Sequence, residues 1–258
     1  MSWEMVDEGW GRRASEFATL SEPANTREYL CVHQHLGVTK GDRLLDMACG
    51  AGLAIELAAI RGALCAGIDA SNRLVAVAQD RSPSADIRVG DMEALPWDDG
   101  SFDIVTSFRG IWGTTTKAVE EAHRVLRPGG QLAMTCWGNV GKSPGAWMMA
   151  PFQWATEEKV RHQADMVSLG RPGIGEAFLA DQGFEVAERF EVPFCFEYPD
   201  PKTYARGLAA TGPAYEAIQG IGEEEFLRRA EELASEHVRE GLPLRGSVEL
   251  FGYLATKP

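Results

Sequence analysis

The chain has 258 residues, with 38 Asp or Glu against 25 Lys or Arg, so its formal net charge is −13 with histidine neutral. Hydrophobic residues make up 45% and charged residues 24%, as in ordinary globular proteins. The acidic balance argues against a nucleic-acid partner, because basic side chains are what displace the counterions of phosphates. Apolar runs are too short for a membrane span, and the first ten residues lack the basic and apolar regions of a secretory signal. We expect a cytoplasmic protein with no nucleic-acid or membrane partner.

Cysteine and histidine usage predicts reduced thiols and no metal site. The five cysteines are odd in number, lie far apart and never form a C-x-x-C pair, which is typical of thiols in a reducing cytosol. The histidines form neither an H-x-x-x-H pair nor a cluster with cysteines, so the donor sets of zinc sites are missing from the sequence.

The first forty residues are predicted to form helices. Apolar side chains recur every three or four residues from Trp3 through Trp10 to Phe17, which places them on one face of a helix. Ser21 is typical of a second helix start, and that helix is expected to run to about residue 36, where Gly37 ends it.

Strands and helices alternate from residue 43 to residue 137. Short apolar stretches are followed by segments whose apolar residues repeat at helical spacing, and this order predicts βαβ units with a mostly parallel sheet. The predicted strands are 43–47, 64–68, 87–89, 102–108 and 131–137, and the predicted helices are 52–61, 71–80 and 114–126.

The remaining residues are less regular. We predict helices at 173–182, 204–218 and 223–240, a strand at 184–196 that Pro193 interrupts, and a last strand at 247–255. A helical insertion between the last two strands would suit a lid over an active site. The expected organisation is an N-terminal helical part (1–40), a core (41–197 and 246–258) and a lid (198–245).

The most informative block is LLDMACGAG, residues 44–52, which follows a predicted strand and opens a helix. Gly50 and Gly52 allow a sharp turn and close approach of a ligand, and the helix that follows presents free N–H groups. A Gly-x-Gly alone is equally typical of a tight turn. Asp69 adds weight, since it ends the next predicted strand 17 residues later, where a carboxylate can bind ribose hydroxyls. Asp91 follows the third strand in the same way.

Together these segments resemble the class I S-adenosylmethionine-dependent methyltransferases of small-molecule type. LLDMACGAG resembles the family's first motif, GIDAS the second, GDMEALPWDDGSFDIV the region that holds adenine, and AHRVLRPGGQLAM the helix-to-fifth-strand motif. The motifs follow in the family's order and cover residues 43 to about 137, just over a third of the chain. The resemblance implies an α/β fold: a doubly wound, Rossmann-like, mostly parallel seven-stranded sheet with N-terminal helices and a helical lid between the last two strands.

The resemblance also implies S-adenosyl-L-methionine as cofactor and a role for each motif residue. Asp46 would orient the loop and favour the cofactor's ammonium group, and Asp69 would bind the ribose hydroxyls. Asp91 would accept a hydrogen bond from the adenine N6. The backbone of residue 92 or 93 would bind a ring nitrogen of adenine. Phe108 would lie near the sulfonium. Apart from the resemblance, Trp10 and the aromatic residue at position 17 on the first helix could close over the cofactor, and simple packing of that helix against the sheet explains them nearly as well. The expected cofactor-binding residues are Asp46, Ala48, Cys49, Gly50, Gly52, Asp69, Ala70, Ser71, Asp91, Met92, Glu93 and Phe108.

One position departs from the family pattern. Ala48 stands where the family most often has glycine, and a methyl group there is tolerated at negative φ but could narrow the methionine pocket. Other nucleotide cofactors fit less well, because a dinucleotide fold would want glycine where Ile55 stands, and no G-x-x-x-x-G-K-[ST] motif is present.

Methyl transfer from a sulfonium needs mainly alignment and exclusion of water, so a catalytic dyad is not required, and the sequence displays none. His162 is a weak candidate for a general base. Arg109 is a weak candidate for holding an acidic acceptor group. Structural placement is the simpler interpretation of the other histidines, His33, His35, His123 and His237.

The acceptor pocket is expected after the fifth strand and in the insertion, where aromatic and methionine side chains crowd: Trp137, Trp147, Met148, Phe152, Trp154, Tyr204 and Tyr215. Such surfaces suit a ring-bearing organic molecule, although packing beneath a lid explains them equally well. We therefore predict methyl transfer to O, N or C of a small molecule by a monomer or homodimer. A non-methylating rearrangement or cyclisation on the same fold is the alternative. A nucleic-acid or protein methyltransferase is disfavoured by the charge, and by the absence of N/D-P-P-[YFW] after the fourth strand.

Overall fold

The computed structural model describes residues 6–112, 115–155 and 168–258. Its first part is a series of short helical segments, the π-helical Asp7–Gly11 and Phe17–Ser21, α1 (Ala14–Glu16) and the 3₁₀-helical Glu22–Asn25, which leads into α2 (Thr26–His35). We call residues 7–25 the N-terminal segment. Its helical character agrees with the apolar spacing, but the helix predicted from Trp3 begins outside the described residues.

A seven-stranded sheet forms the centre of the molecule, with the strand order β3-β2-β1-β4-β5-β9-β6. β1 to β5 run parallel, and β9 is antiparallel to both of its neighbours, β5 and β6. The strands are β1 (Arg43–Met47), β2 (Leu64–Asp69), β3 (Asp86–Val89), β4 (Phe102–Phe108), β5 (Leu126–Trp137), β6 (Glu185–Glu191) and β9 (Leu250–Thr256). The predicted doubly wound, mostly parallel sheet is therefore confirmed.

Helices cover both faces of the sheet, and each face has its own apolar core. On one face lie α2, α3 (Leu53–Ile60) and α4 (Asn72–Arg81), with buried Val32, Ala58 and Leu74. On the other lie α5 (Thr116–Val125) and α7 (Ile174–Ala180), with buried Val119 and Leu179. Because both faces are covered, parallel strands such as β1 and β4 are buried almost throughout.

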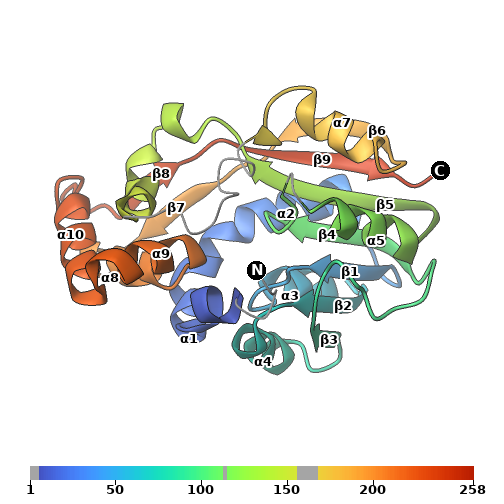
Figure 1. Ribbon diagram of the computed structural model, residues 1–258, viewed down its shortest axis with the longest axis horizontal. Helices are drawn as coiled ribbons and strands as arrows, with labels where there is room; N and C mark the ends of the chain where they lie inside the picture. Colours follow the sequence, from blue (N-terminus) through green and yellow to red (C-terminus); the bar gives the residue numbers. More distant parts are fainter. Residues whose placement is uncertain (1–5, 113–114, 156–167) are drawn as a thin grey trace.

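A smaller unit extends from one end of the sheet (Figure 1). It holds α8 (Pro201–Ala209), α9 (Gly212–Ile221) and α10 (Glu223–Ser235), together with a two-stranded sheet of β7 (Cys195–Tyr198) and β8 (Leu244–Ser247). Short 3₁₀ turns at Val140–Lys142 and Ala146–Trp154 lead to it from β5. We call α8, α9 and α10 the lid helices. Their core contains Tyr204, Phe226 and Met148, all fully buried.

Two predicted elements differ from the structure for reasons of backbone chemistry. The helix expected at 204–218 is two helices, since Pro213 lacks an N–H and stands at the start of α9. The strand expected at 184–196 divides near Pro193 into β6 and β7, which join different sheets. β5 also begins earlier than predicted, at Leu126, with an irregular register against β4.

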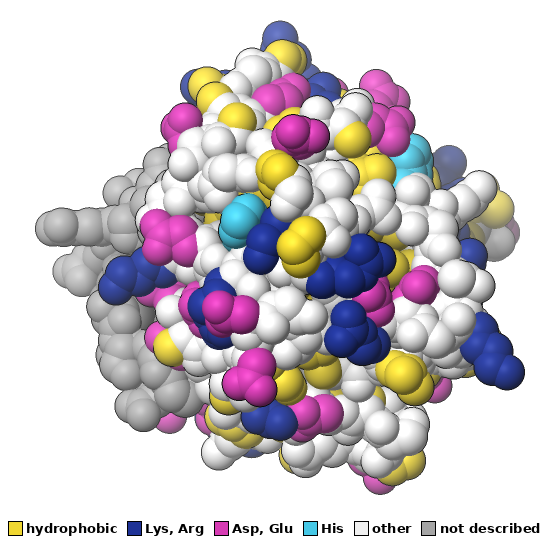
Figure 2. Space-filling view, turned by 90° about the vertical axis from the view of Figure 1, so that its right-hand side faces the viewer, with side chains coloured by type: hydrophobic (Ala, Val, Ile, Leu, Met, Phe, Trp, Pro, Cys, Tyr) yellow, Lys and Arg dark blue, Asp and Glu magenta, His cyan; other side chains and the backbone are white. Residues whose placement is uncertain are grey.

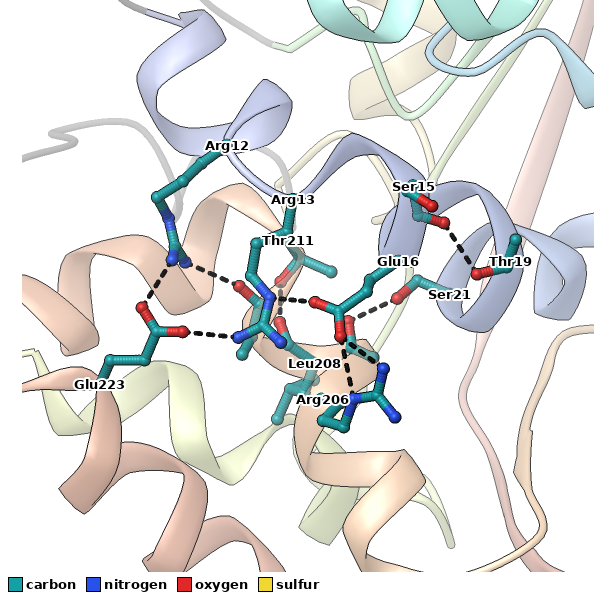
Figure 3. Close-up of polar contacts among 12 residues, drawn as sticks. Arg12, Arg13, Ser15, Glu16, Thr19, Ser21, Arg206, Leu208, Thr211 and Glu223 are labelled. Carbon is teal, nitrogen blue, oxygen red and sulfur yellow. Dashed lines mark hydrogen bonds and ion pairs between the residues drawn. The ribbon is translucent and has the colours of Figure 1, made fainter.

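The N-terminal segment lies between the lid helices and α4 (Figure 1). Figure 3 shows the polar contacts that join it to the lid helices. Arg12 and Arg13 both pair with Glu223 at the start of α10, at 2.9 and 2.7 Å. Glu16 pairs with Arg13 and with Arg206 of α8. The buried Ser21 hydroxyl donates to the Gly207 carbonyl, so the segment is fixed to α8 along its length.

The surface carries charges of both signs. On the face in Figure 2, basic and acidic side chains lie interspersed. Within the described residues, no helix combines the length and apolarity that crossing a bilayer requires.

Candidate active site

The turn from β1 to α3 requires glycine for both conformation and space. Gly50 and Gly52 have φ values of 55° and 83°, in the left-handed region that L side chains rarely adopt. A Cβ at Gly52 would lie 2.6 Å from the Cβ of Ala78, so α3 packs against α4 through this missing side chain. At Gly50 the nearest side-chain atoms to such a Cβ, on Phe17 and Glu22, are at 3.5–3.8 Å. Gly50 therefore presents no side chain on its outer side, and Phe17 and Glu22 cover that side at van der Waals distance.

Ala48 also has a left-handed backbone, with φ of 57°, which corrects the expectation that its methyl group needs negative φ. A Cβ placed at Gly110, after β4, would lie 2.5 Å from the Cβ of Ala48. The methyl group thus occupies space left by a glycine of the neighbouring loop.

Asp69 joins the end of β2 to this turn. Its carboxylate is 8% exposed and accepts from the Gly50 N–H at 2.9 Å and from the Ser71 N–H at 2.8 Å. Ser71 in turn caps α4, because its hydroxyl accepts from the Leu74 N–H. An ionised carboxylate has about four acceptor positions, so Asp69 retains capacity for a further donor, such as a ribose hydroxyl.

Asp46 lies in β1 directly below the turn. It is 2% exposed, and the Thr106 hydroxyl of β4 donates to it at 2.7 Å. Burial, together with the nearby carboxyl groups of Asp69, Glu22 and Glu28, raises the pKa of Asp46 to about 8. Burial likewise raises the pKa of Asp69. Both groups would be more easily ionised beside a cation.

The third strand ends in a compact turn. Asp91 accepts from the Glu93 N–H at 2.8 Å, and the half-buried Met92 packs against the core beneath β4. This turn leaves the Asp91 carboxylate with unused acceptor positions at the same end of the sheet as Asp69.

Arg109, just after β4, is held within the protein. It has a φ of 60°, and its guanidinium lies 2.9 Å from Glu28, a fully buried residue of α2 that also accepts from the Thr135 hydroxyl at 2.6 Å. The Trp137 and Phe194 rings flank it at 4.9 and 5.2 Å. These contacts engage the guanidinium group of Arg109, so this residue is able to position the loop that follows β4. Next to it, Phe108 packs edge-on against Tyr29 of α2, with ring centroids 4.5 Å apart.

The N-terminal segment contributes residues that sequence patterns did not single out. Glu22 is 1% exposed; it forms an ion pair with Arg81 of α4 and accepts from the Leu53 N–H at 3.3 Å. Arg81 also donates to the carbonyls of Ala18 and Ala51, at 2.8 and 3.0 Å. The sequence around Glu22 gives no sign that this glutamate is buried, because its partners lie about thirty or more residues away along the chain.

The buried carboxyl groups around the turn outnumber their basic partners. Glu22, Glu28, Asp46 and Asp69 are each at most 8% exposed, whereas the ion pairs to them come from Arg81 and Arg109. Uncompensated buried negative charge is costly, so the arrangement favours a cationic ligand. S-adenosylmethionine, with a sulfonium, an ammonium and a carboxylate, carries a net positive charge, and the residues present fit it.

The histidines show no catalytic grouping among the described residues. His33 is fully buried without a hydrogen-bond partner, and burial lowers its pKa to about 4, so it is neutral at physiological pH. His35, His123 and His237 pack against Phe190, Phe184 and Trp147 respectively. His162 lies outside the described residues. Within the described ranges, no group of three or more His, Cys, Asp or Glu could hold a metal ion.

Most of the aromatic residues expected around the acceptor lie in or against the lid core. Trp147, Phe152 and Trp154 pack against that core, and the Tyr204 hydroxyl donates to the Met148 carbonyl at 3.0 Å. A cavity of about 440 Å³ opens nearby, lined by residues of the 139–144, 192–195 and 245–249 stretches and by Arg27. It contains no residue of the turn at 46–52 and is therefore distinct from the site described above.

Comparison with known proteins agrees with this arrangement. A family model described as a methyltransferase domain matches residues 45–134. The chain is 32% identical over 183 residues to an uncharacterised methyltransferase of Synechocystis sp., covering 68% of this chain and 82% of that protein. It is 35% identical over 146 residues to the 27-O-demethylrifamycin SV methyltransferase of Amycolatopsis mediterranei, covering 51% of this chain but only 53% of that enzyme. Among solved structures, the cyclase SpnF superposes with a TM-score of 0.64 at 18% identity, covering 100% and 97% of the two chains.

The chain therefore belongs to the class I S-adenosylmethionine-dependent methyltransferases, a family of enzymes that use S-adenosylmethionine as cofactor. The family predicted from the motifs is confirmed. The likeness to SpnF shows the shared fold over the whole chain.

Proposed function

We propose that this protein transfers the methyl group of S-adenosylmethionine to an O, N or C atom of a small organic acceptor, a ring-bearing metabolite or natural-product intermediate. The observation that carries the proposal is the group of buried carboxyls around the bare glycine turn, which suits a cationic adenosyl ligand. The rifamycin methyltransferase, whose name gives 27-O-demethylrifamycin SV as its substrate, supports a small-molecule acceptor.

The proposed cofactor contacts follow the strand ends. Asp69 accepts from the ribose hydroxyls, with Ala70 and Ser71 beside it, and Asp91 accepts from the adenine N6. The backbone of Met92 or Glu93 meets a ring nitrogen of adenine, and Phe108 lies near the sulfonium. The methionine part runs along residues 48–52 above Asp46.

When bound, the cofactor supplies an activated methyl group, so the protein has to align the acceptor and exclude water. The N-terminal segment is suited to exclusion of water, since Phe17 covers Gly50 while Trp10 fills the space at Gly212 of α9. Residues 198–245, which include the lid helices, are proposed to cover the acceptor. A general base is needed only where the acceptor arrives protonated, and His162 stays a weak candidate for one. Arg109 is proposed to act by holding the loop after β4.

Binding and product analysis test the proposal. S-adenosylhomocysteine should bind the purified protein with micromolar affinity in calorimetry, and Asp69→Ala should weaken that affinity at least about tenfold, or 1.4 kcal/mol. Ser101→Ala, at a hydroxyl that bonds only the Asp98 carbonyl, is the matched control and should leave binding unchanged. No binding to wild type, or an Asp69→Ala variant that binds like wild type, would contradict the proposal.

A non-methylating rearrangement or cyclisation is the second candidate, favoured by one observation. SpnF, which is described as a [4+2]-cyclase, matches this fold over 100% of the chain. The two functions differ in product mass: methyl transfer adds one methylene unit and releases S-adenosylhomocysteine. Conversion of an acceptor without either change would favour the second candidate.

A further inference from the structure

Glu22 lies at the outer side of the glycine turn with acceptor capacity to spare. One carboxylate oxygen pairs with Arg81, while the other accepts a long bond from the Leu53 N–H at 3.3 Å, and the Ala51 backbone also interacts with the carboxylate. That second oxygen is 3.8 Å from the point where a side chain at Gly50 would place its Cβ. A buried carboxylate with so few donors and almost no access to water is an incomplete site.

From this geometry we propose that Glu22 binds the α-ammonium group of the cofactor's methionine part. The inference rests on the proposed function, since it assigns a residue to the same cofactor. A ligand along the bare side of Gly50 would meet this second oxygen of Glu22 and the Phe17 ring, whose Cε1 lies 3.5 Å from the same point. A carboxylate attracts an ammonium ion through a charge-assisted hydrogen bond.

The charges nearby decide which end of the methionine part Glu22 meets. Asp46 and Asp69 are buried close to it; burial raises the pKa of Cys49 in the same turn, and the three carboxyls add to that rise. A ligand carboxylate placed at Glu22 would add a like charge, whereas an ammonium ion offsets one. Asp46 is less well placed for direct contact, because it lies within β1 and is engaged by Thr106. Asp46 therefore attracts the ammonium group through its charge, from beneath the turn, and Glu22 accepts the hydrogen bond from that ammonium group.

Two ligands that differ only in the amino-acid part isolate this contact. S-adenosylhomocysteine carries the ammonium group, and 5′-methylthioadenosine lacks the whole amino-acid end while keeping adenosine and sulfur. Calorimetry would measure both ligands on wild type, Glu22→Gln and Glu22→Asp. Glutamine keeps the size and the oxygen for the Leu53 N–H but removes the charge. We expect Glu22→Gln to weaken the affinity for S-adenosylhomocysteine at least about tenfold, while its affinity for 5′-methylthioadenosine changes less than about twofold. The affinity of Glu22→Asp for S-adenosylhomocysteine should lie between those of wild type and Glu22→Gln.

The matched control is Glu16→Gln, the same change in the same segment, at a carboxylate that binds Arg13 and Arg206 instead of the turn. It should leave both affinities unchanged. Equal losses for both ligands in Glu22→Gln would show a purely structural role, and no loss for either would show no contact; each result overturns the assignment. Retained 5′-methylthioadenosine binding also reports that the variant is folded. If wild type binds neither ligand, the proposed function itself has failed.

Discussion

Ala48 and Gly110 lie in direct contact, although they belong to different loops of the site. A Cβ at position 110 would come within 2.5 Å of the Ala48 Cβ and 2.8 Å of the Ser107 hydroxyl. Both loops carry a non-glycine residue in the left-handed region, Ala48 at φ 57° and Arg109 at φ 60°. The cofactor turn and the loop after β4 are thus packed against each other by residues whose backbones are strained.

This contact predicts a coupled pair of substitutions. Gly110→Ala should destabilise the protein by about 1–3 kcal/mol, because its methyl group overlaps that of Ala48. Ala48→Gly should stabilise it by about 1 kcal/mol, since a left-handed conformation costs an L residue that much. The double variant should recover part of the Gly110→Ala loss. Urea unfolding of the four proteins measures the coupling, and strictly additive effects would contradict the contact.

The buried pair of Glu28 and Arg109 predicts a second, larger effect. Glu28→Ala leaves the guanidinium without its carboxylate and the Thr135 hydroxyl without its acceptor, so a loss of about 3 kcal/mol is expected. Glu188→Ala is the matched control, because Glu188 forms a partly exposed pair with His35, and such pairs contribute about 1 kcal/mol or less. Equal losses in the two variants, measured by denaturant unfolding, would show that burial of Glu28 has no special weight.

The elements around β1 to β5 could be predicted because each is specified locally. Apolar strands, helical spacing and the Ser71 cap lie within a few residues of one another. The pairing of β7 with β8 could not, since Cys195 meets Ser247, about fifty residues away, and either strand alone resembles a continuation of its neighbour. Pro193 indicated an interruption but not the change of sheet.

The candidate site shows the same division. Asp46, Asp69 and the glycines follow strands at recognisable spacing, so the sequence alone could group them. Glu22 and Glu28 join that group only through packing of the N-terminal segment and α2 against the sheet. Their roles depend on Arg81 and Arg109, which lie 59 and 81 residues further along the chain.

Asp46 predicts how stability depends on pH. Its pKa is raised from 3.8 to about 8 in the folded protein, so between those values the folded state holds a proton that the unfolded state has lost. Stability from this group is therefore present at low pH and falls as pH rises toward 8, by at most about 1.4 kcal/mol per pH unit. Asp46→Asn keeps an acceptor for Thr106 and removes the titration.

The ligand-free Asp46→Asn variant should therefore be more stable than wild type, by a margin that is small at pH 5 and widens as pH rises to 8. Unfolding in urea at pH 5, 6.5 and 8 gives the comparison, with Asp98→Asn as the control at an exposed carboxyl. Parallel pH curves for Asp46→Asn and wild type would show that Asp46 does not titrate in this range.

The contacts in Figure 3 predict that the lid helices are held by the N-terminal segment. Replacing Arg12 and Arg13 by alanine removes both pairs to Glu223 and the bond from Arg12 to the Ala209 carbonyl. Amide hydrogen exchange should then accelerate in residues 7–25 and in α8, while β1 and β4 stay protected, because their core does not involve these arginines. Arg228→Ala is the control, since Arg228 pairs only within α10, with Glu225 and Glu232.

Because residues 17 and 22 of the same segment contact the glycine turn, S-adenosylhomocysteine should slow exchange in the segment and, through it, in α8. In the Arg12→Ala/Arg13→Ala variant the ligand should still protect the segment but no longer α8. Ligand protection of α8 that survives in this variant would show that the lid senses the cofactor by another route.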